Sequence, residues 1–345
     1  MSNEDTQPIR QESVQNPDSP VTPVQSQPVI QARDLSMVFG DQVAVDHINL
    51  DIPPGQIFGY IGPSGSGKTT TIRLLTGLYQ PTRGEVTIFG HPPSGFAVRD
   101  RERIGYMPQT FALYPNLTVR ENMGFAASMY GLSKNRGKRI DELLDIVELS
   151  NHRNKLAQKI SGGMQRRLSL AATLIHQPDL IFLDEPTASI DPVLRRKFWD
   201  YFEELRRQGV TLFVTTQYVT EAAYCDLVGV MSNGKLLLVD TPDGLRHAAY
   251  GGDVINVTTE KPVDYLQIQD LNRQPYVVRN VEITGEKSYR IVVKDASADI
   301  PALIDWGQRN DVKTDTVDQY LPAFDDVFVS LIRREEGARN GGENE

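Results

Sequence analysis

The sequence predicts an α/β fold followed by a smaller α+β domain, and three observations support this prediction. Between residues 29 and 245, short apolar runs typical of buried strands alternate with helical segments and with Pro- or Gly-rich turns. The strand-like run Ile57–Ile61 leads directly into the glycine-rich segment 62–69, and a helical segment follows. After Thr241-Pro242 the pattern changes, which predicts a separate domain over residues 248–335.

The first half of the chain contains strands, one short helix and then a longer helical region. The expected strands are Val43–Leu50, Gln56–Ile61 and Glu85–Phe89. A helix is expected at Thr69–Gly77, with Ile72 and Leu75 toward the core. Residues from about 110 to 178 are expected to form a helical subdomain, because apolar residues there recur at helical spacing.

The second half returns to strands. Buried strands are expected at Leu180–Leu183 and Thr211–Thr215. Asn233-Gly234 separates two further apolar runs and is typical of a type I′ hairpin. The C-terminal domain is expected to contain the strands Val254–Val257, Val277–Ile283 and Tyr289–Val293 and the helix Ile300–Gln308.

Composition limits the classes of protein that are possible. With 345 residues, of which 39% are hydrophobic and 23% charged, the chain can form one large domain and one small domain. The formal net charge of −9 argues against nucleic acid as a main partner, because that role needs a basic surface. A single cysteine, Cys225, excludes an intrachain disulfide. No apolar run approaches the roughly 18 residues of a membrane span, so a membrane role requires a separate partner.

Both ends of the chain are expected to be disordered. Residues 1–28 are rich in Gln, Pro and Ser and contain no aromatic residue, so they cannot bury enough surface to offset the entropy of ordering. Residues 336–345 are Gly-rich and charged, and the same expectation applies to them.

The glycine-rich segment that follows the strand Gln56–Ile61 has the pattern of a phosphate-binding loop. Its glycines let backbone N–H groups converge on phosphate oxygens, and the next helix adds its positive N-terminal end. Lys68 is expected to reach the outer phosphates, and the Thr69 hydroxyl is expected to ligate Mg²⁺. The nucleotide-binding residues predicted here are Gly62, Pro63, Ser64, Gly65, Ser66, Gly67, Lys68, Thr69 and Thr70.

Two acidic residues, Asp184 and Glu185, end the apolar strand that begins at Leu180. Ligands of open α/β sheets bind at the carboxyl ends of the strands, so these carboxylates are expected beside the phosphate-binding loop. Asp184 is predicted to hold Mg²⁺, directly or through water. Glu185 is predicted to orient the attacking water and to act as general base.

Together these motifs resemble those of the nucleotide-binding subunits of ABC transporters, over residues from about 30 to 245. The resemblance implies a P-loop NTPase domain of the ABC type, with a mixed sheet and a helical subdomain, that binds and hydrolyses ATP with Mg²⁺. It implies that Phe39 stacks on adenine and that Ala44 lines the same pocket. Ordinary core or strand packing stays open for both residues. It also implies that Gln109 contacts Mg²⁺ and the attacking water.

Two further motifs imply that the protein works as a head-to-tail pair. Ser161, Gly162 and Gly163 match the family's signature segment, which contacts the γ-phosphate bound by the other protomer. Met164 stands where the family usually has Gln. Residues 186–191 match the family's loop that crosses the dimer interface, and the resemblance implies that Asp191 is the acid of that loop.

One position departs from the family. In Thr215-Thr216-Gln217-Tyr218, Gln217 stands where the family normally has a histidine that bonds the γ-phosphate. Glutamine can donate a hydrogen bond, but it cannot carry charge or shuttle a proton. Either Gln217 is a working substitute, or the site binds ATP and hydrolyses it slowly. The sequence also resembles the daunorubicin-resistance and multidrug exporter branch, which favours the first alternative.

The resemblance extends to partners and location. Residues 112–122 match the stretch that forms a groove for a short helix of the membrane permease, although core packing is the alternative. The protein is therefore expected to be peripheral, at the cytoplasmic face of the membrane, and to power export of drugs or lipids. A subunit with negligible hydrolysis, or an ABC ATPase without a transport role, remain the alternatives. The C-terminal domain resembles the accessory domain of some exporter ATPases.

Overall fold

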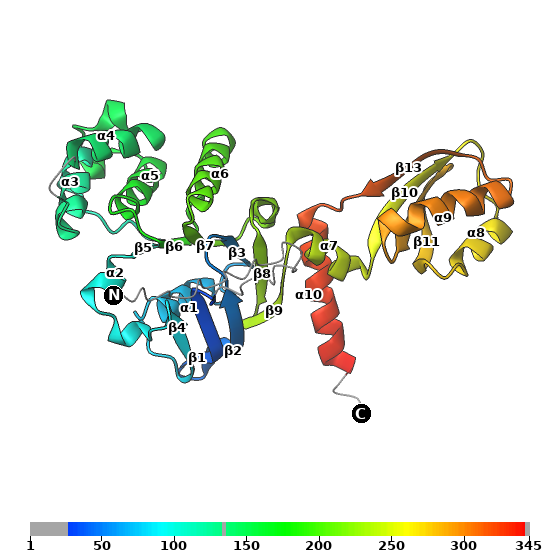
Figure 1. Ribbon diagram of the computed structural model, residues 1–345, viewed down its shortest axis with the longest axis horizontal. Helices are drawn as coiled ribbons and strands as arrows, with labels where there is room; N and C mark the ends of the chain where they lie inside the picture. Colours follow the sequence, from blue (N-terminus) through cyan, green and yellow to red (C-terminus); the bar gives the residue numbers. More distant parts are fainter. Residues whose placement is uncertain (1–26, 133–135, 342–345) are drawn as a thin grey trace, which may run out of the picture.

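A six-stranded sheet lies at the centre of the computed structural model, which describes residues 27–132 and 136–341. We call residues 27–252 the main body. The strand order is β5-β6-β7-β3-β8-β9, and all neighbours are parallel except β8 and β9 (Figure 1). The strands are β3 (Ile57–Ile61), β5 (Ile104–Met107), β6 (Leu180–Asp184), β7 (Thr211–Thr216), β8 (Leu227–Ser232) and β9 (Lys235–Asp240).

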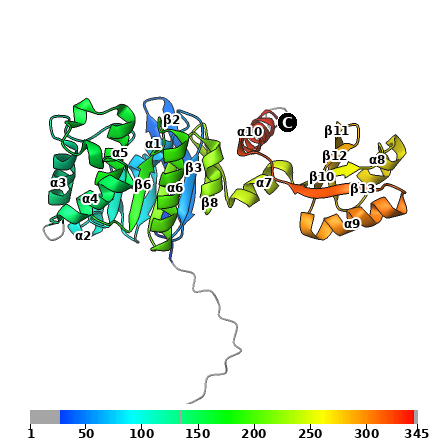
Figure 2. The same ribbon diagram turned by 90° about the horizontal axis from the view of Figure 1, so that it is seen from above.

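A second, antiparallel sheet of order β2-β1-β4 and several helices complete the main body. Helices α3, α4 and α5 group into the expected helical subdomain, and α6 lies beside them (Figures 1 and 2). The bounds are β1 (Ile30–Phe39), β2 (Gln42–Ile52), α1 (Lys68–Leu75), β4 (Arg83–Ile88), α2 (Val98–Arg101), α3 (Val119–Met129), α4 (Arg136–Ile146), α5 (Gly162–Thr173) and α6 (Pro192–Arg207).

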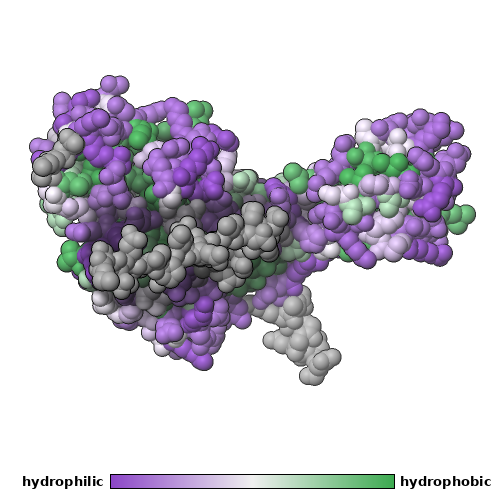
Figure 3. All heavy atoms as spheres, viewed as in Figure 1, coloured by the Kyte–Doolittle hydropathy of each residue, from purple (hydrophilic) through white to green (hydrophobic). Residues whose placement is uncertain are grey.

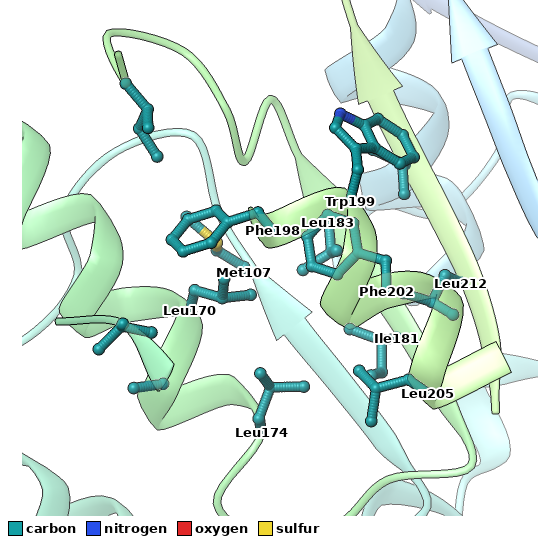
Figure 4. Packing of buried hydrophobic residues seen from close by; sticks show 14 of the residues in the cluster. Met107, Leu170, Leu174, Ile181, Leu183, Phe198, Trp199, Phe202, Leu205 and Leu212 are labelled. Atoms are coloured by element: carbon teal, nitrogen blue, oxygen red, sulfur yellow. The ribbon is translucent and has the colours of Figure 1, made fainter. Parts of the chain in front are cut away.

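Both faces of the six-stranded sheet are covered by apolar residues. On β3, Ile57 and Ile61 join the core under α5 and α6, whereas Phe58 and Tyr60 join the core under the antiparallel sheet. This alternation follows from the two-residue period of a strand. Figure 4 shows the first core, where Phe202 of α6 lies among the residues of the sheet. Each such fully buried side chain contributes about 2 kcal/mol to stability.

The C-terminal domain, residues 253–320, has its own core. Its sheet is antiparallel in the order β11-β12-β10-β13, and its core includes Ile255, Tyr289, Leu303 and Trp306. Figures 1 and 2 show that this domain projects away from the main body. The elements are β10 (Asp253–Thr259), α8 (Tyr265–Asn272), β11 (Val277–Gly285), β12 (Ser288–Val293), α9 (Ala296–Arg309) and β13 (Thr314–Tyr320).

Helices α7 (Pro242–Tyr250) and α10 (Phe324–Gly341) connect the two parts. Phe324 and Val327 of α10 belong to the core of the main body, together with Leu245 of α7. Residues 248–335 were expected to form one accessory domain. In the structure, α10 instead packs on the core of the main body. The apolar stripe of an amphipathic helix does not reveal which core it joins, so the sequence could not show this contact.

The remaining differences lie at the ends and in elements without a strong pattern. The expected tail 336–345 is helical over residues 336–341, because α10 continues to Gly341, and the other residues of this tail lie outside the described residues. The tail expected at residues 1–28 lies almost entirely outside them as well. Strands β1, β5 and β13 and helix α6 were not predicted.

The fold class expected from the sequence is confirmed, including the turn between β8 and β9. Asn233 and Gly234 have φ angles of 48° and 80°, as a type I′ turn requires. In the part of the chain that the structure describes, no helix is both long and apolar enough to cross a membrane. The face shown in Figure 3 is largely hydrophilic.

The contact between α10 and the main body predicts a position-specific effect on stability. Val327 is 1% exposed and lies against Ile61, Val230 and Leu245. We expect Val327→Asp to lower the free energy of unfolding by about 3 kcal/mol, because it buries a carboxylate without a partner. Val329→Asp is the matched control, since Val329 of the same helix is 46% exposed. Thermal unfolding of both variants tests this, and equal midpoints would show that α10 does not stay docked.

Candidate nucleotide-binding site

Two features fix the conformation of the glycine-rich loop between β3 and α1: hydrogen bonds from Lys68 and the backbone conformation of Gly67. The Lys68 Nζ donates to the carbonyl oxygens of Gly62 and Pro63, at 2.8 and 2.9 Å. Gly67 is the N-cap of α1 and has a φ of 107°, a value that favours glycine. A Cβ atom at Gly67 would lie 2.3 Å from the Ala44 carbonyl oxygen. The loop therefore needs glycine at this position for two independent reasons.

The hairpin between β8 and β9 supports the same loop. The Gly234 N–H donates to the Ser66 carbonyl oxygen at 3.0 Å, and the Asp46 N–H donates to the Gly234 carbonyl oxygen at 2.9 Å. The Ser66 hydroxyl is buried and has no hydrogen-bond partner among the described residues. A buried hydroxyl without a partner is costly, and an anion held in the loop would satisfy it.

Lys68 is almost completely buried, with 4% of its surface exposed. Burial lowers the pKa of Lys68, and the nearby carboxylates of Glu185 and Asp184 partly oppose this shift. The ammonium group is thus poorly solvated, and a polyphosphate bound in the loop would offset the missing solvation.

Asp184 lies at the C-terminal end of β6 and is fully buried. Its Oδ1 accepts hydrogen bonds from the Thr69 hydroxyl at 3.2 Å and from the Thr215 hydroxyl at 2.7 Å. Its Oδ2 is buried without a partner among the described residues. One oxygen is therefore satisfied by hydroxyl groups, and the other is free to bind a cation or a water held by one.

Glu185 is held in an uncommon backbone conformation. Its φ of 52° lies in the left-handed region, which costs a residue with a side chain about 1 kcal/mol. Its N–H donates to the carbonyl oxygen and to the hydroxyl of Thr215, both at 3.1 Å. Its carboxylate accepts from the Gln109 Nε2 at 3.2 Å. Strain held in place by neighbours at the end of a buried strand is typical of functional sites.

A cavity of about 480 Å³ joins these groups. It is lined by most of the predicted binding loop together with Gln109 and Glu185. Four further lining residues were not among the predicted site residues. The new residues are Gln42, Val43, Asn233 and Gly234. The turn motif at Asn233-Gly234 was visible in the sequence, but its contact with the binding loop depends on the tertiary fold.

Phe39 and Ala44 both line this cavity. Phe39 is 41% exposed and makes an edge contact with Tyr79, with 5.6 Å between ring centroids. Phe39 is therefore at the mouth of the cavity and not in the core, which removes the alternative of ordinary core packing. An exposed aromatic ring at this place can stack on a planar heterocycle.

Nine predicted site residues do not line the cavity of this chain. Four of them come from the loop itself and from the end of β6, and the other five are Ser161, Gly162, Gly163, Asp191 and Gln217; the four are Gly62, Pro63, Ser66 and Asp184. Ser161 caps helix α5 by accepting from the Met164 N–H at 3.3 Å, and Asp191 caps α6 by accepting from the Leu194 N–H at 3.0 Å. Gln217 is exposed just after β7. Instead, Gly162 and Gly163 line a second cavity of about 290 Å³, which shares Gln109 with the first.

The stretch that follows Gln109 offers both apolar and exposed groups. Leu113 is half-buried against the core of the main body, which agrees with the core-packing alternative for that residue. Tyr114 is 50% exposed and contacts the ring of Phe125, which is 38% exposed, with 4.6 Å between centroids. An aromatic pair therefore remains accessible on the helical subdomain.

The fold and the arrangement of the site define the class of this protein. Residues 45–188 match the family described as "ABC transporter". The chain is 35% identical over 322 residues to the Nod factor export ATP-binding protein I of Sinorhizobium fredii, an alignment that covers 93% of this chain and 90% of that protein. The chain belongs to the ATP-binding subunits of ABC transporters.

Two further comparisons agree with this assignment. The chain is 38% identical over 234 residues to the probable multidrug ABC transporter ATP-binding protein YbhF of Escherichia coli K12. That alignment covers 68% of this chain and 40% of YbhF, so the chain spans about two fifths of the length of that relative. The dimeric cassette MJ0796, solved in a post-hydrolysis state with ADP and Pi, is similar with a TM-score of 0.56 and 27% identity. The structural similarity covers 61% of this chain and 98% of that structure.

The close approach at Gly67 predicts how the loop responds to substitution. Gly67→Ala should destabilise the protein and abolish ATP binding, because the new methyl group collides with the Ala44 carbonyl group. Gly65→Ala is the control, since Gly65 also has a positive φ, 78°, but has no atom within 4 Å of a Cβ position. That variant should lose only about 1 kcal/mol. Thermal unfolding without nucleotide separates the two, and equal losses would contradict the predicted collision.

Proposed function

We propose that this chain is the ATP-binding and ATP-hydrolysing subunit of an ABC exporter that powers a separate membrane permease. The observation that carries the proposal is the cavity in which the phosphate-binding loop faces Glu185 and Gln109. A loop of converging amides, a buried lysine and a carboxylate held by an amide are together what phosphoryl transfer to water requires.

ATP is proposed to bind with its base on Phe39 and its phosphates in the loop. Ala44 lies beside the base, and the amides of residues 62–70 surround the phosphates. Lys68 then exchanges its bonds to the loop carbonyls for bonds to the outer phosphates. The unpaired Ser66 hydroxyl lies within this loop and supports the same placement.

The residues beside the loop fit Mg²⁺. Thr69 supplies a hydroxyl, and Asp184 supplies the buried Oδ2 that has no partner among the described residues. In the part of the chain that the structure describes, no group of three or more His, Cys, Asp or Glu side chains is arranged so that it could hold a metal ion. This suits Mg²⁺, which is usually held by one or two carboxylates together with substrate phosphates and water. Bound there, with Gln109 nearby, the ion would neutralise the charge of the phosphates.

Glu185 is the proposed general base. Its carboxylate borders the cavity and accepts from Gln109, so both side chains can orient a water molecule toward the γ-phosphate. Gln217 is proposed to donate to the γ-phosphate after a change of side-chain conformation, because it is exposed in this structure. Glu185, Gln109 and Gln217 are thus the proposed catalytic residues.

Two protomers are proposed to complete each other's sites. Ser161, Gly162 and Gly163 do not reach the cavity of their own chain, and Asp191 lies at the start of α6. In a head-to-tail pair the signature segment would close over the γ-phosphate of the partner, where the N-terminus of α5 favours an anion. The related cassette MJ0796 was solved as a dimer with ADP and Pi, which supports this arrangement.

The pair is proposed to act on a permease at the cytoplasmic face of the membrane. Residues 112–122 carry the exposed Tyr114, and α3 adds Phe125 and Met129, which are 38% and 69% exposed. An apolar surface of this kind suits a short amphipathic helix of the permease. The relatives include a probable multidrug transporter subunit and a Nod factor export subunit, so an amphiphilic drug or lipid is the proposed cargo.

One observation favours a second candidate, a subunit that binds ATP but hardly hydrolyses it. Gln217 cannot carry the charge of a histidine, and it lies exposed outside the cavity. In that case ATP binding alone would close the pair, and hydrolysis would contribute little.

The assignment of Glu185 predicts a separation of turnover from pairing. Glu185→Gln should lower ATP turnover by at least about 100-fold, because the amide cannot accept the proton of the attacking water. ATP-driven dimerisation should persist, since the binding loop is unchanged. Turnover and light scattering with Mg-ATP measure the two effects. Residual turnover equal to that of the wild type would refute the role of Glu185.

The two candidates are separated by the residue at position 217. If Gln217 is a working substitute, wild-type turnover in membranes with the co-expressed permease should be clear and Mg²⁺-dependent. Gln217→His should then change it by less than about tenfold, because a neutral amide already donates one hydrogen bond. Turnover that appears only in Gln217→His would instead support the second candidate.

A further inference from the structure

Arg166 donates hydrogen bonds to two segments that lie far apart in the sequence, at Gln109 and at Asp184-Glu185, and the family resemblance assigned it no role. We propose that Arg166 is a positioning residue that couples the signature segment, residues 161–163, to the general base Glu185 of the same protomer. The inference rests on the proposed function of these two motifs.

Among the described residues, the hydrogen bonds of the Arg166 guanidinium group all go to main-chain carbonyl oxygens. Its Nε donates to the Glu185 carbonyl at 2.8 Å, and its Nη2 donates to the Asp184 carbonyl at 2.7 Å and also to that of Glu185. Its Nη1 donates to the Gln109 carbonyl at 2.6 Å. The planar fork of arginine spreads its N–H donors over three nitrogen atoms, so it suits carbonyl groups of different residues better than the compact ammonium group of lysine.

These bonds hold the peptide group that follows Glu185, whereas Thr215 holds the peptide group that precedes it. The N–H of Glu185 donates to Thr215, and its carbonyl group accepts from Arg166. The left-handed conformation of Glu185 is therefore supported on both of its peptide groups. Because the Gln109 side chain also donates to the Glu185 carboxylate, Arg166 fixes both the base and the residue that orients it.

Arg166 keeps its positive charge in this position. Burial lowers its pKa, whereas the carboxylates of Glu185 and Asp184 oppose the shift. Arginine is not deprotonated in proteins, so the guanidinium remains a donor to all three carbonyls. Lys68 faces the same two carboxylates.

The other end of the connection is helix α5. This helix begins at Gly162, directly after its N-cap Ser161. Arg166 therefore lies in the second turn of α5, shortly after the signature segment. Gly163 also approaches the loop after Glu185, because its Cβ position would lie 3.3 Å from the Ser189 carbonyl oxygen. Within one rigid helix, a shift of the signature segment moves Arg166 and with it the main chain at Asp184 and Glu185.

In the proposed head-to-tail pair this connection joins the two ATP sites. The signature segment of one protomer lies on the γ-phosphate in the partner, while Arg166 lies on the base of its own site. Occupancy of one site would therefore align the base of the other, which is a coupling between two distinct sites. Turnover should consequently rise cooperatively with ATP concentration.

The test compares Arg166→Gln and Arg166→Lys with Arg139→Gln. Arg139 is a matched control, because its Nη2 donates to the Leu174 carbonyl, the C-cap of the same helix, at 3.2 Å. The measurements are ATP turnover against ATP concentration and binding of a fluorescent ATP analogue to the monomer.

For Arg166→Gln we expect turnover at saturation to fall about 10- to 100-fold and the Hill coefficient to fall toward 1, because the base is no longer aligned. Binding of the analogue should change by less than about twofold, since Arg166 lies outside the phosphate-binding loop. Arg166→Lys keeps the charge but cannot reach three carbonyls, so it should remain without cooperativity. Arg139→Gln should retain both turnover and cooperativity.

Several results would overturn the inference: an unchanged Hill coefficient in Arg166→Gln, a wild type without cooperativity, or an equal loss in Arg139→Gln. If the wild type shows no turnover, hydrolysis fails as part of the proposed function. The ATP concentration at half-maximal dimerisation then tests Arg166 separately. A higher concentration for Arg166→Gln would support the coupling, and an unchanged one would exclude it.

Discussion

The candidate site depends on the parallel register of β6 against β7, which pairs Asp184 with Thr215. Thr215 uses its hydroxyl twice, as a donor to Asp184 at 2.7 Å and as an acceptor from the Glu185 N–H at 3.1 Å. A slip of one residue would turn the Asp184 side chain to the opposite face of the sheet. The apolar residues that precede Asp184 are buried, so the hydrophobic core holds the strand that carries the carboxylates at its end.

Hydrogen bonds connect this strand pair to the rest of the site on two sides. Toward β3, Thr69 connects Asp184 to the phosphate-binding loop. Toward the helical subdomain, Arg166 connects the main chain of Asp184 and Glu185 to α5. The groups expected to handle phosphate, metal and water are thus linked by hydrogen bonds. Such preorganisation reduces the reorganisation required when the reaction takes place.

The C-terminal domain is attached to the main body through two helices and not through the site. Its sheet and helices α8 and α9 enclose a core of their own, whereas α10 packs on the main body beside α7. The domain is therefore attached through two helices that share the apolar core of the main body. A change in that core can reach the domain through α7 and α10, although the domain has no residue in the nucleotide-binding cavity.

Local motifs were enough to predict the fold class, the phosphate-binding loop and the acids at the end of β6, because these features lie on contiguous residues whose spacing follows directly from the chemistry. Three features could not be predicted in this way: the place of Asn233-Gly234 in the cavity, the bonds of Arg166 to three carbonyl groups, and the packing of α10 on the main body. Each is a contact between segments far apart in the chain. Such contacts arise from sheet order and helix packing, which periodicity in a single sequence does not specify.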